Sequence, residues 1–353
     1  LPHAAGRELT LLAPRVRRGR RTRSPQYDDR RATRLGVPVV MSAPFASVLV
    51  IANPVSGTYL PATAETVRRR FADAGHTVTL AVTEQPGQAR KLAAEALAPG
   101  GPDVVVALGG DGTAHDVAAG LANTGNSSPQ QAARVPALLI LPTGTGNSFY
   151  REIWADRPWR EALELAVTEP YFRAIDLARV VENGASALLG ASTGVVAQSL
   201  ITARDITDAG RERYEKAVAA SLRAFTPYPG RVLVDGEVVQ EGPTVFANVG
   251  GGRHRGGRFK LLPDSVMDDG LLDVCVVGTA LPLHELPALS RDGGHVGREG
   301  VVYARGRSIV VERTDGHPLV FEYDGDVLET PGERFTLDVV PGALRVVAPS
   351  PEG

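Results

Sequence analysis

Residues 109–115 combine glycines, a carboxylate and a hydroxyl in a stretch that could bind phosphate. The stretch reads Gly-Gly-Asp-Gly-Thr-Ala-His and follows an apolar run at 104–108. The run has the length and β-branched content of a buried parallel strand, and the apolar residues that follow Thr113 have helical spacing. Glycines let a backbone approach phosphate closely, and the start of a helix attracts negative charge. The order strand, glycine turn, helix therefore predicts an anion-binding loop.

Asp111 is the residue that a plain phosphate loop does not need, because its carboxylate would repel the phosphates. It would serve if it held a magnesium ion or received the proton of an acceptor hydroxyl. In the alternative interpretation it only caps the helix. Two common nucleotide signatures are excluded: His115 stands where G-x-G-x-x-G needs its third glycine, and no G-K-[ST] occurs. His115 itself reads as an ordinary polar residue near a helix start.

Alternating strand and helix patterns position this loop among three others. Buried-strand runs lie at 47–52, 76–83, 104–108 and 137–141, and helical patterns at 61–74 and 87–98. This alternation predicts a parallel sheet with right-handed crossovers, in which ligands bind beyond the carboxyl ends of the strands. Four residues stand at those ends, namely Asn53, Thr83, Asp111 and Thr145. We therefore expect four loops to meet at one crevice.

The pattern changes after about residue 150 to short strands separated by turn signals such as Asp324-Gly325. We predict a Rossmann-like three-layer α/β domain over 46–172, followed by a C-terminal β-sandwich domain over 173–349 whose last strand could return to the first domain. Residues 1–45 are expected to be a disordered Arg-rich extension, with ten Arg in residues 1–40. We favour an upstream extension with Met41 as the first residue over a lipid-binding arm or a transit peptide.

Composition narrows the class of protein. The 353 residues are 43% hydrophobic with a net charge of −2, which is typical of a soluble globular protein and argues against a dedicated nucleic-acid binder. Cys275 is the single cysteine, so no internal disulfide forms and a reducing compartment is favoured. No apolar run approaches 18 residues, so no membrane span is expected. We expect a cytoplasmic protein and leave open whether it is a homodimer.

An ordered series of motifs resembles the catalytic domain of diacylglycerol kinases. In the first half these are Asn53-Pro54-x-Ser56-Gly57, Thr83-x-x-Pro86-Gly87, Gly109–Thr113 and Gly144-Thr145-Gly146-Asn147. In the second half they are Ile175-Asp176-Leu177, Asn248 with Gly250–Gly252, Pro263-Asp264, Asp268–Val274 and Asp324-Gly325-Asp326. The series spans about 46–348 and resembles the soluble bacterial-type lipid kinases, which are related to sphingosine kinases. Its Gly-Thr-Gly-Asn element and its late Asp-Asp-Gly-Leu-Leu-Asp run count against NAD kinase.

The resemblance implies ATP- and Mg²⁺-dependent transfer of the γ-phosphate to a hydroxyl of diacylglycerol or a related lipid, by a protein resting on the membrane surface. Nucleotide contacts are expected from Asn53, Thr83, Gly109, Gly110, Asp111, Gly112, Thr113, Thr145 and Asn147. Asn53 could bond the base or the ribose, or equally could hydrogen-bond only within its own turn. Asp326 is expected to be the general base, with Asp111 acting through magnesium or as the base instead.

The resemblance also implies a structural magnesium site at the Asp268-Asp269-Gly270 turn. Its ligands would be the carboxylate of Asp269 and the carbonyls of Val266 and Leu271, which are oxygens of the kind a hard cation prefers. The alternative is a plain turn before the strand at 271–277, where Asp and Gly are favoured for local reasons.

Three residues depart from the family pattern. Asp326 replaces the usual Glu, Ser148 stands where an Asp commonly follows Gly-Thr-Gly-Asn, and His115 replaces a common Asn. The shorter side chain of Asp326 reduces the reach of the expected base, which can matter for catalysis. These departures leave two alternatives open: a sphingoid-base kinase, and a non-catalytic nucleotide- or lipid-binding relative.

Overall fold

The computed structural model describes residues 45–122, 135–208, 210–330 and 332–351. The predicted extension lies outside the described residues except for Phe45, which is buried and stacks on His76. Within the described ranges, no helix is long and apolar enough to cross a membrane.

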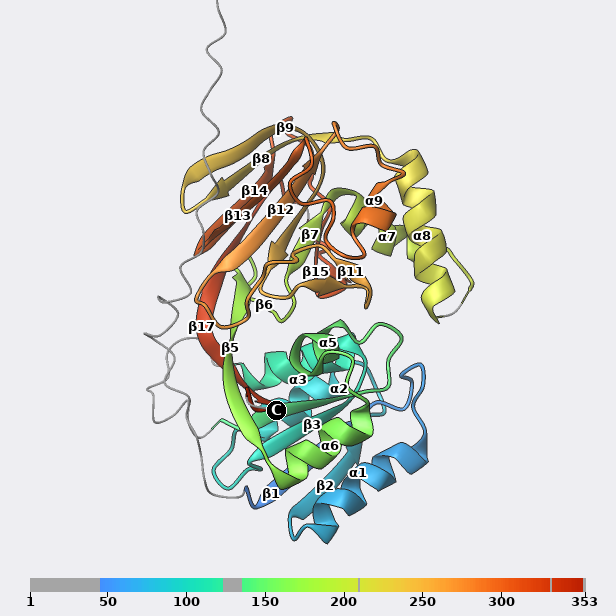
Figure 1. The fold of residues 1–353 in the computed structure, drawn as a ribbon, viewed down its shortest axis with the longest axis vertical. Helices are drawn as coiled ribbons and strands as arrows, with labels where there is room; N and C mark the ends of the chain where they lie inside the picture. The colour runs from blue at the N-terminus through green and yellow to red at the C-terminus, as the bar shows by residue number, and fades with distance from the viewer. Residues whose placement is uncertain (1–44, 123–134, 209, 331, 352–353) are drawn as a thin grey trace, which may run out of the picture. The chain divides into compact units, whose positions relative to one another are not determined.

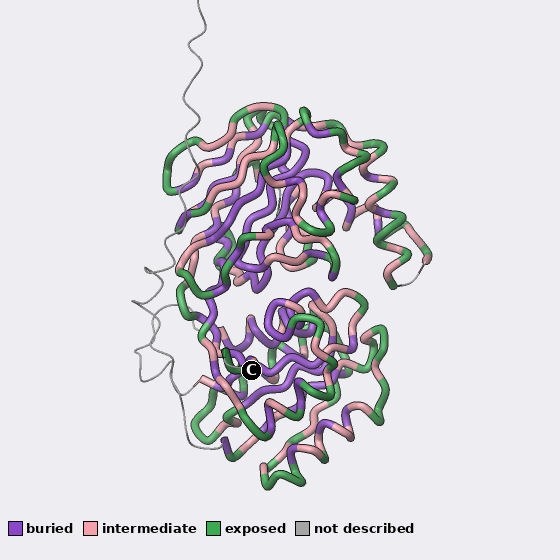
Figure 2. Tube along the Cα trace, in the orientation of Figure 1, coloured by how far each residue is buried: buried purple, intermediate pink, exposed green. Residues whose placement is uncertain are grey.

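The first lobe is built on a parallel sheet in the order β4-β3-β1-β2. Its strands are β1 (Ser47–Ala52), β2 (Thr77–Val82), β3 (Val104–Gly109) and β4 (Ala137–Pro142). Its helices are α1 (Pro61–Asp73), α2 (Gln88–Glu95), α3 (Asp111–Leu121), α5 (Ser148–Trp154) and α6 (Trp159–Thr168). All six residues of β3 are buried, as expected for the apolar run at its place between β1 and β4 (Figures 1 and 2). The predicted parallel α/β arrangement is confirmed.

The second lobe is an antiparallel β-sandwich with helices on it. Its first elements are β5 (Tyr171–Val180), β6 (Ser186–Ala187), β7 (Ala191–Thr193), α7 (Gly194–Arg204), α8 (Gly210–Ala224), β8 (Tyr228–Val234) and β9 (Glu237–Gly250). The later ones are β10 (His254–Arg255), β11 (Phe259–Lys260), β12 (Leu272–Gly278), α9 (Leu286–Leu289), β13 (Val301–Gly306), β14 (Ser308–Arg313), β15 (Phe321–Tyr323), β16 (Asp326–Val327) and β17 (Arg334–Ala348). Two apolar clusters form its core. This lobe confirms the predicted α/β-plus-sandwich fold class.

The strands β5 and β17 are long and connect the two lobes. They pair antiparallel over most of their length, and Val346 of β17 pairs parallel with Leu138 of β4. The last strand therefore joins the sheet of the first lobe (Figure 1). The exact domain boundary at 172–173 stays a prediction.

Two features of the second lobe depart from a simple succession of short strands. Pro341-Gly342 forms a bulge within β17 rather than a break between two strands, and the Gly342 N–H donates to Asp176. The strands β6 and β7 are separated by residues 188–190. The backbone of the intervening residues 188–190 turns toward a side chain far along the chain, which short-range patterns do not encode.

Candidate active site

The four residues predicted to meet beyond the sheet all lie at the carboxyl ends of its parallel strands. Asn53 follows β1, Thr83 follows β2, Asp111 follows β3 and Thr145 follows β4. Because these strands are neighbours, their ends share one edge of the sheet. The predicted convergence of loops is present in the structure.

The Asn53 side chain ties two of these loops together. Its Oδ1 accepts the Val55 N–H at 3.1 Å, which closes its own turn, and its Nδ2 donates to the Thr113 hydroxyl at 3.0 Å. Thr83 is buried, and its hydroxyl lies 3.4 Å from the carbonyl of Ala52. These side chains stabilise the loops that would surround a nucleotide.

The glycines of these loops differ in their surroundings. A Cβ on Gly109 would lie 2.3 Å from the Thr113 side chain of the same loop, and one on Gly144 would lie 2.3 Å from the Gly110 Cα, so Gly144 allows the loops after β3 and β4 to pack on each other. A Cβ on Gly112 would meet nothing within 4 Å. Gly112 lies in the first turn of α3, where backbone N–H groups have no partner within the helix. Gly112 therefore borders open space, and its contact with phosphate stays a prediction.

In the loop after β4, Asn147 is bonded to the backbone and Thr145 is exposed. Asn147 adopts a φ of 55°, and its amide bonds the backbone of Gly144 at 3.0 Å through Oδ1 and at 2.8 Å through Nδ2. Asn147 therefore holds the loop closed. Thr145 is exposed at its tip, free to donate to a ligand.

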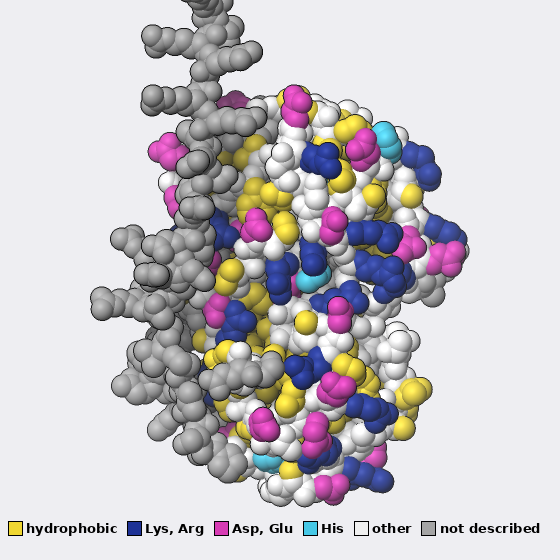
Figure 3. All heavy atoms as spheres, viewed as in Figure 1, with side chains coloured by type: hydrophobic (Ala, Val, Ile, Leu, Met, Phe, Trp, Pro, Cys, Tyr) yellow, Lys and Arg dark blue, Asp and Glu magenta, His cyan; other side chains and the backbone are white. Residues whose placement is uncertain are grey.

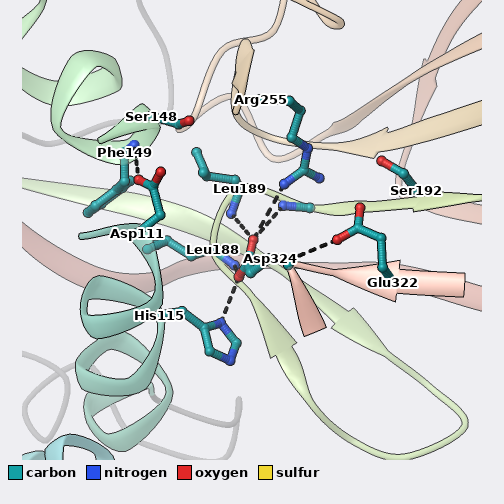
Figure 4. Close-up of polar contacts among 12 residues, drawn as sticks. Asp111, His115, Ser148, Phe149, Leu188, Leu189, Ser192, Arg255, Glu322 and Asp324 are labelled. Carbon is teal, nitrogen blue, oxygen red and sulfur yellow. Dashed lines mark hydrogen bonds and ion pairs between the residues drawn. The ribbon is translucent and has the colours of Figure 1, made fainter. Parts of the chain in front are cut away.

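Asp111 caps a helix, but not its own. Its Oδ1 accepts the Phe149 N–H at 3.0 Å, at the start of α5 (Figure 4). Burial raises the pKa of Asp111, against the opposing effect of hydrogen bonds from Ser148 and Phe149. A Cβ on Gly146 would lie 2.9 Å from Oδ2, so glycine is needed for the close approach of this loop. The alternative interpretation, in which Asp111 caps its own helix, is therefore wrong, since α3 has no side-chain cap and Asp111 is its first residue.

Asp324 is the centre of a buried polar cluster where the two lobes meet. It adopts a φ of 49° in the turn between β15 and β16, and its side chain is only 3% exposed. Its carboxylate accepts backbone N–H groups from residues 188–190 and the Nδ1 hydrogen of His115 at 2.8 Å, and Arg255 Nη1 lies 3.6 Å away (Figure 4). His115 is on α3, so this bond joins the first lobe to the hairpin of the second.

The Asp324–His115 hydrogen bond favours the charged form of both groups. Burial opposes the charged form of Asp324, but His115, Arg255 and the Leu188 N–H hold its pKa below the ordinary value. Burial likewise opposes the charge on His115 and Arg90 repels it, but Asp324 and, more weakly, Asp326 raise the pKa of the imidazole. The other ring nitrogen of His115, Nε2, lies 3.1 Å from Arg90 Nη2.

More polar side chains lie beneath this hairpin. Glu322 is fully buried, which raises its pKa, and it accepts the Gly325 N–H at 2.9 Å. Asn248 Oδ1 accepts from Ser192 Oγ at 2.6 Å and from Arg255 Nε at 3.1 Å. Sequence reasoning missed the roles of Glu322, Arg255 and His115. The signals for this region were the turn at Asp324-Gly325 and the family motifs that contain Asn248 and Asp324.

Asp326 lies on the same hairpin but is exposed. It begins β16 and pairs with Tyr323 across the turn. Its charge acts on His115, which lies at the start of α3 beside the phosphate loop. The buried Asp324 therefore anchors the turn, and Asp326 two residues later faces solvent near the loops.

The predicted magnesium turn is well ordered by protein contacts. Asp269 Oδ1 accepts the Leu271 N–H at 3.1 Å, and Oδ2 lies 3.6 Å from Arg305. The Gly270 N–H donates to Asp176 at 2.7 Å. Burial raises the pKa of Asp269, whereas the hydrogen bond from the Leu271 N–H and the charge of Arg305 lower it. The described residues contain no cluster of three or more His, Cys, Asp or Glu side chains arranged for a metal. The magnesium site of Asp269 with the carbonyls of Val266 and Leu271 therefore stays a prediction.

We predict that His115→Asn loses a pH-dependent part of the stability. The raised pKa of His115 adds stability below its ordinary value of 6.5 that fades as pH rises through the folded-state pKa. The lowered pKa of Asp324 adds stability that is lost only as pH falls below 3.8. The variant should therefore be less stable by about 1–3 kcal/mol near pH 5.5, and by less at pH 9.

Thermal melting across this pH range measures the difference. His317→Asn is the matched control, because His317 is 71% exposed beside Asp315. A constant difference in stability between the parent and His115→Asn at every pH would contradict a raised folded-state pKa of His115.

Comparisons with known proteins identify the family. Residues 47–180 match the model of the diacylglycerol kinase catalytic domain, and residues 190–348 match that of the YegS C-terminal NAD kinase beta sandwich-like domain. A Pseudomonas aeruginosa protein named "Probable lipid kinase YegS-like" is 33% identical over 79% of this chain and 87% of its own length. Escherichia coli YegS, also named a "Probable lipid kinase", is 29% identical over 87% of this chain and 97% of its own length.

A solved structure has the same fold. The crystal structure of a diacylglycerol kinase from Bacillus anthracis superimposes with a TM-score of 0.64 at 24% identity, over 88% of this chain and 99% of that one. The two domain matches and the relative that is 33% identical show that the chain belongs to the diacylglycerol kinase-like family of lipid kinases.

Proposed function

We propose that the protein transfers the γ-phosphate of ATP, with magnesium, to a hydroxyl of diacylglycerol or a related membrane lipid, acting at the cytoplasmic membrane surface. The observation that carries this proposal is the hairpin of Asp324 and Asp326, which is bonded through His115 to the helix that begins at the phosphate loop. In this proposal the same hairpin supplies the exposed carboxylate of Asp326 on the acceptor side, and the effect of its charge on His115 supports that position.

The nucleotide side of the reaction would use the loops after β1, β2, β3 and β4. Gly112 and the start of α3 offer N–H groups and open space for phosphate oxygens, and Thr145 offers a hydroxyl. Magnesium, when bound with ATP, neutralises charge on the transferring phosphates. Asp111 is the carboxylate at this loop that could hold it, through the oxygen that does not cap α5.

On the acceptor side, Asp326 would remove the proton of the lipid hydroxyl. The hydroxyl oxygen then bonds to the γ-phosphorus as the bond to the bridging β–γ oxygen breaks, and ADP leaves. Two features support Asp326 over its neighbour: Asp326 is exposed, whereas Asp324 has its oxygens occupied by backbone N–H groups and His115.

The acyl part of the lipid has a candidate site in the second lobe. A cavity of about 460 Å³ lies among α7, α8 and the segment that leads into β15. Its walls include the apolar residues Ala220, Phe225, Leu319 and Val320. Arg313 is a charged residue of the lining. Because Val320 immediately precedes β15, a chain bound here would end close to the hairpin that carries Asp326.

A screen of a lipid extract with labelled ATP tests the proposal. Phosphorylated diacylglycerol supports it, and a phosphorylated sphingoid base would move the acceptor to that class. ATP binding with no labelled lipid, at saturating lipid and magnesium, would favour the non-catalytic alternative and contradict the proposal.

Asp111→Asn should lower lipid phosphorylation by about two to four orders of magnitude while melting normally. The amide oxygen can still cap α5 through the Phe149 N–H, but the charge is gone. Asp116→Asn, on the same helix, is the control. Near-parent turnover of Asp111→Asn would mean that the cap is its whole role.

Asp326→Ala should lower the rate by about two to four orders of magnitude with ATP binding unchanged, because a positioned base contributes on that scale. Asp326→Glu should keep or raise activity on diacylglycerol. The control is Asp292→Ala, in another exposed Asp-Gly turn of the same lobe. An alanine variant as fast as the parent would transfer the base role to Asp111.

Ala220→Phe should fill the cavity and raise KM for long-chain lipids more than for short-chain analogues. Ala219→Phe, on the exposed side of α8, controls for the added ring. Equal KM changes for the two variants, measured in mixed micelles, would exclude the cavity as the acyl site.

Magnesium should raise the melting temperature of the parent protein without ATP, and Asp269→Asn should abolish that increase, since a ligand that binds only the folded state stabilises it. Melting in magnesium chloride against sodium chloride of equal ionic strength measures the effect. If magnesium raises the melting temperature of Asp269→Asn as much as that of the parent, the Asp268-Asp269-Gly270 turn does not bind magnesium.

A further inference from the structure

A cavity of about 370 Å³ beside α5 and the β10–β11 hairpin has a strongly basic lining. The cationic and imidazole side chains that line it are Arg151, Arg253, His254, Arg258, Lys260 and Arg291. Among the lining residues, Asp156 is the only carboxylate, and its side chain is 94% exposed. Lys and Arg side chains gather over the face that α5 and β11 present in the space-filling view (Figure 3). The cavity therefore attracts anions.

A buried carboxylate beneath the cavity fixes its wall. Glu152 of α5 is 1% exposed, accepts Arg253 Nε at 3.0 Å and the His254 N–H at 2.7 Å, and also bonds the His254 ring. Burial would raise the pKa of Glu152, but His254 and Arg253 lower it, so Glu152 is ionised. Its charge holds the β10 backbone against α5 and is not available to the other cations.

Three cations of the lining have no internal counter-charge. In the described part of the chain, no carboxylate lies within ion-pair distance of Arg258, Lys260 or Arg291, whereas Arg151 pairs with Asp156 at 3.4 Å. Cations held around one cavity repel each other, and an anion with two negative charges relieves that repulsion. Guanidinium groups also match phosphate oxygens in a bidentate geometry, which favours phosphate over a simple halide.

We propose that this cavity is a second phosphate-binding site, which takes the phosphate group of a molecule other than the nucleotide. None of the residues assigned to the nucleotide lines it. The phosphate could be free or part of a lipid headgroup, since both present the same charged oxygens.

The position of the cavity connects it to the catalytic loops. The Gly257 N–H donates to the Ser148 hydroxyl at 2.7 Å, at the start of the helix that Asp111 caps. Arg255, next to His254 on β10, lies 3.6 Å from Asp324 on its other side. A bound phosphate that draws the β10–β11 hairpin toward it therefore acts on the helix that Asp111 caps and on the buried Asp324.

The variant Arg258→Ala/Lys260→Ala tests the site, with Arg69→Ala/Lys91→Ala as control. The control removes the same charges from exposed helix positions of the other lobe. Inorganic phosphate, titrated calorimetrically, should bind the first variant at least about tenfold more weakly than the parent and should bind the control normally. Sedimentation with phosphatidylcholine vesicles, with and without phosphatidylserine, provides the second probe.

The two probes separate the sources of the phosphate. Loss of vesicle binding together with phosphate affinity supports a lipid headgroup, and loss of phosphate affinity alone supports a free phosphate. Equal behaviour of both variants with both probes overturns the proposal. Displacement of the bound phosphate by ATP also overturns it, because the cavity would then belong to the nucleotide site. No turnover is measured, so failure of the proposed kinase function leaves this result unaffected.

Discussion

The burial of one charged group, the carboxylate of Asp324, constrains the arrangement of the whole site. A buried carboxylate without partners would cost several kcal/mol, so it must be surrounded by donors. The partners come from separate places: backbone N–H groups of 188–190, Arg255 from β10 and His115 from α3. Satisfying one charge thus fixes the hairpin of the second lobe against the phosphate-loop helix of the first.

Helix α5 has a comparable role on the other side of the loops. Its start is capped by Asp111, its Ser148 receives the β10–β11 turn, and its buried Glu152 holds Arg253 and the β10 backbone. A short helix with few residues has little stability of its own, so these charged and hydrogen-bonded ends determine where it lies. Asp111, to which we assign a chemical role, and the basic cavity, to which we assign a second phosphate, therefore both depend on the position of α5.

Local patterns were sufficient for the parallel sheet of the first lobe, but they did not predict helix α5. The run at 47–52 matches β1 residue for residue, and the loops after the parallel strands meet as predicted, because burial and strand direction are encoded in short stretches. The Asp324 cluster was not predictable in this way, because His115 and Asp324 are 209 residues apart and each is unremarkable in its own segment. The turn signal Asp324-Gly325 and the family motif pointed to the hairpin, and the motif indicated Asp326 as the base, but neither gave Asp324 its role as the buried anchor.

Hydrogen exchange, followed by mass spectrometry, of the parent and the Asp324→Asn variant tests most directly whether this carboxylate couples the lobes. Asn tolerates the positive φ at this position, so the turn itself can persist. Asp315→Asn, in a separate exposed turn, is the control. Faster exchange in 321–327 of the second lobe and also in α3 of the first is the predicted result. Faster exchange confined to the hairpin, with α3 as protected as in the parent, would contradict the account.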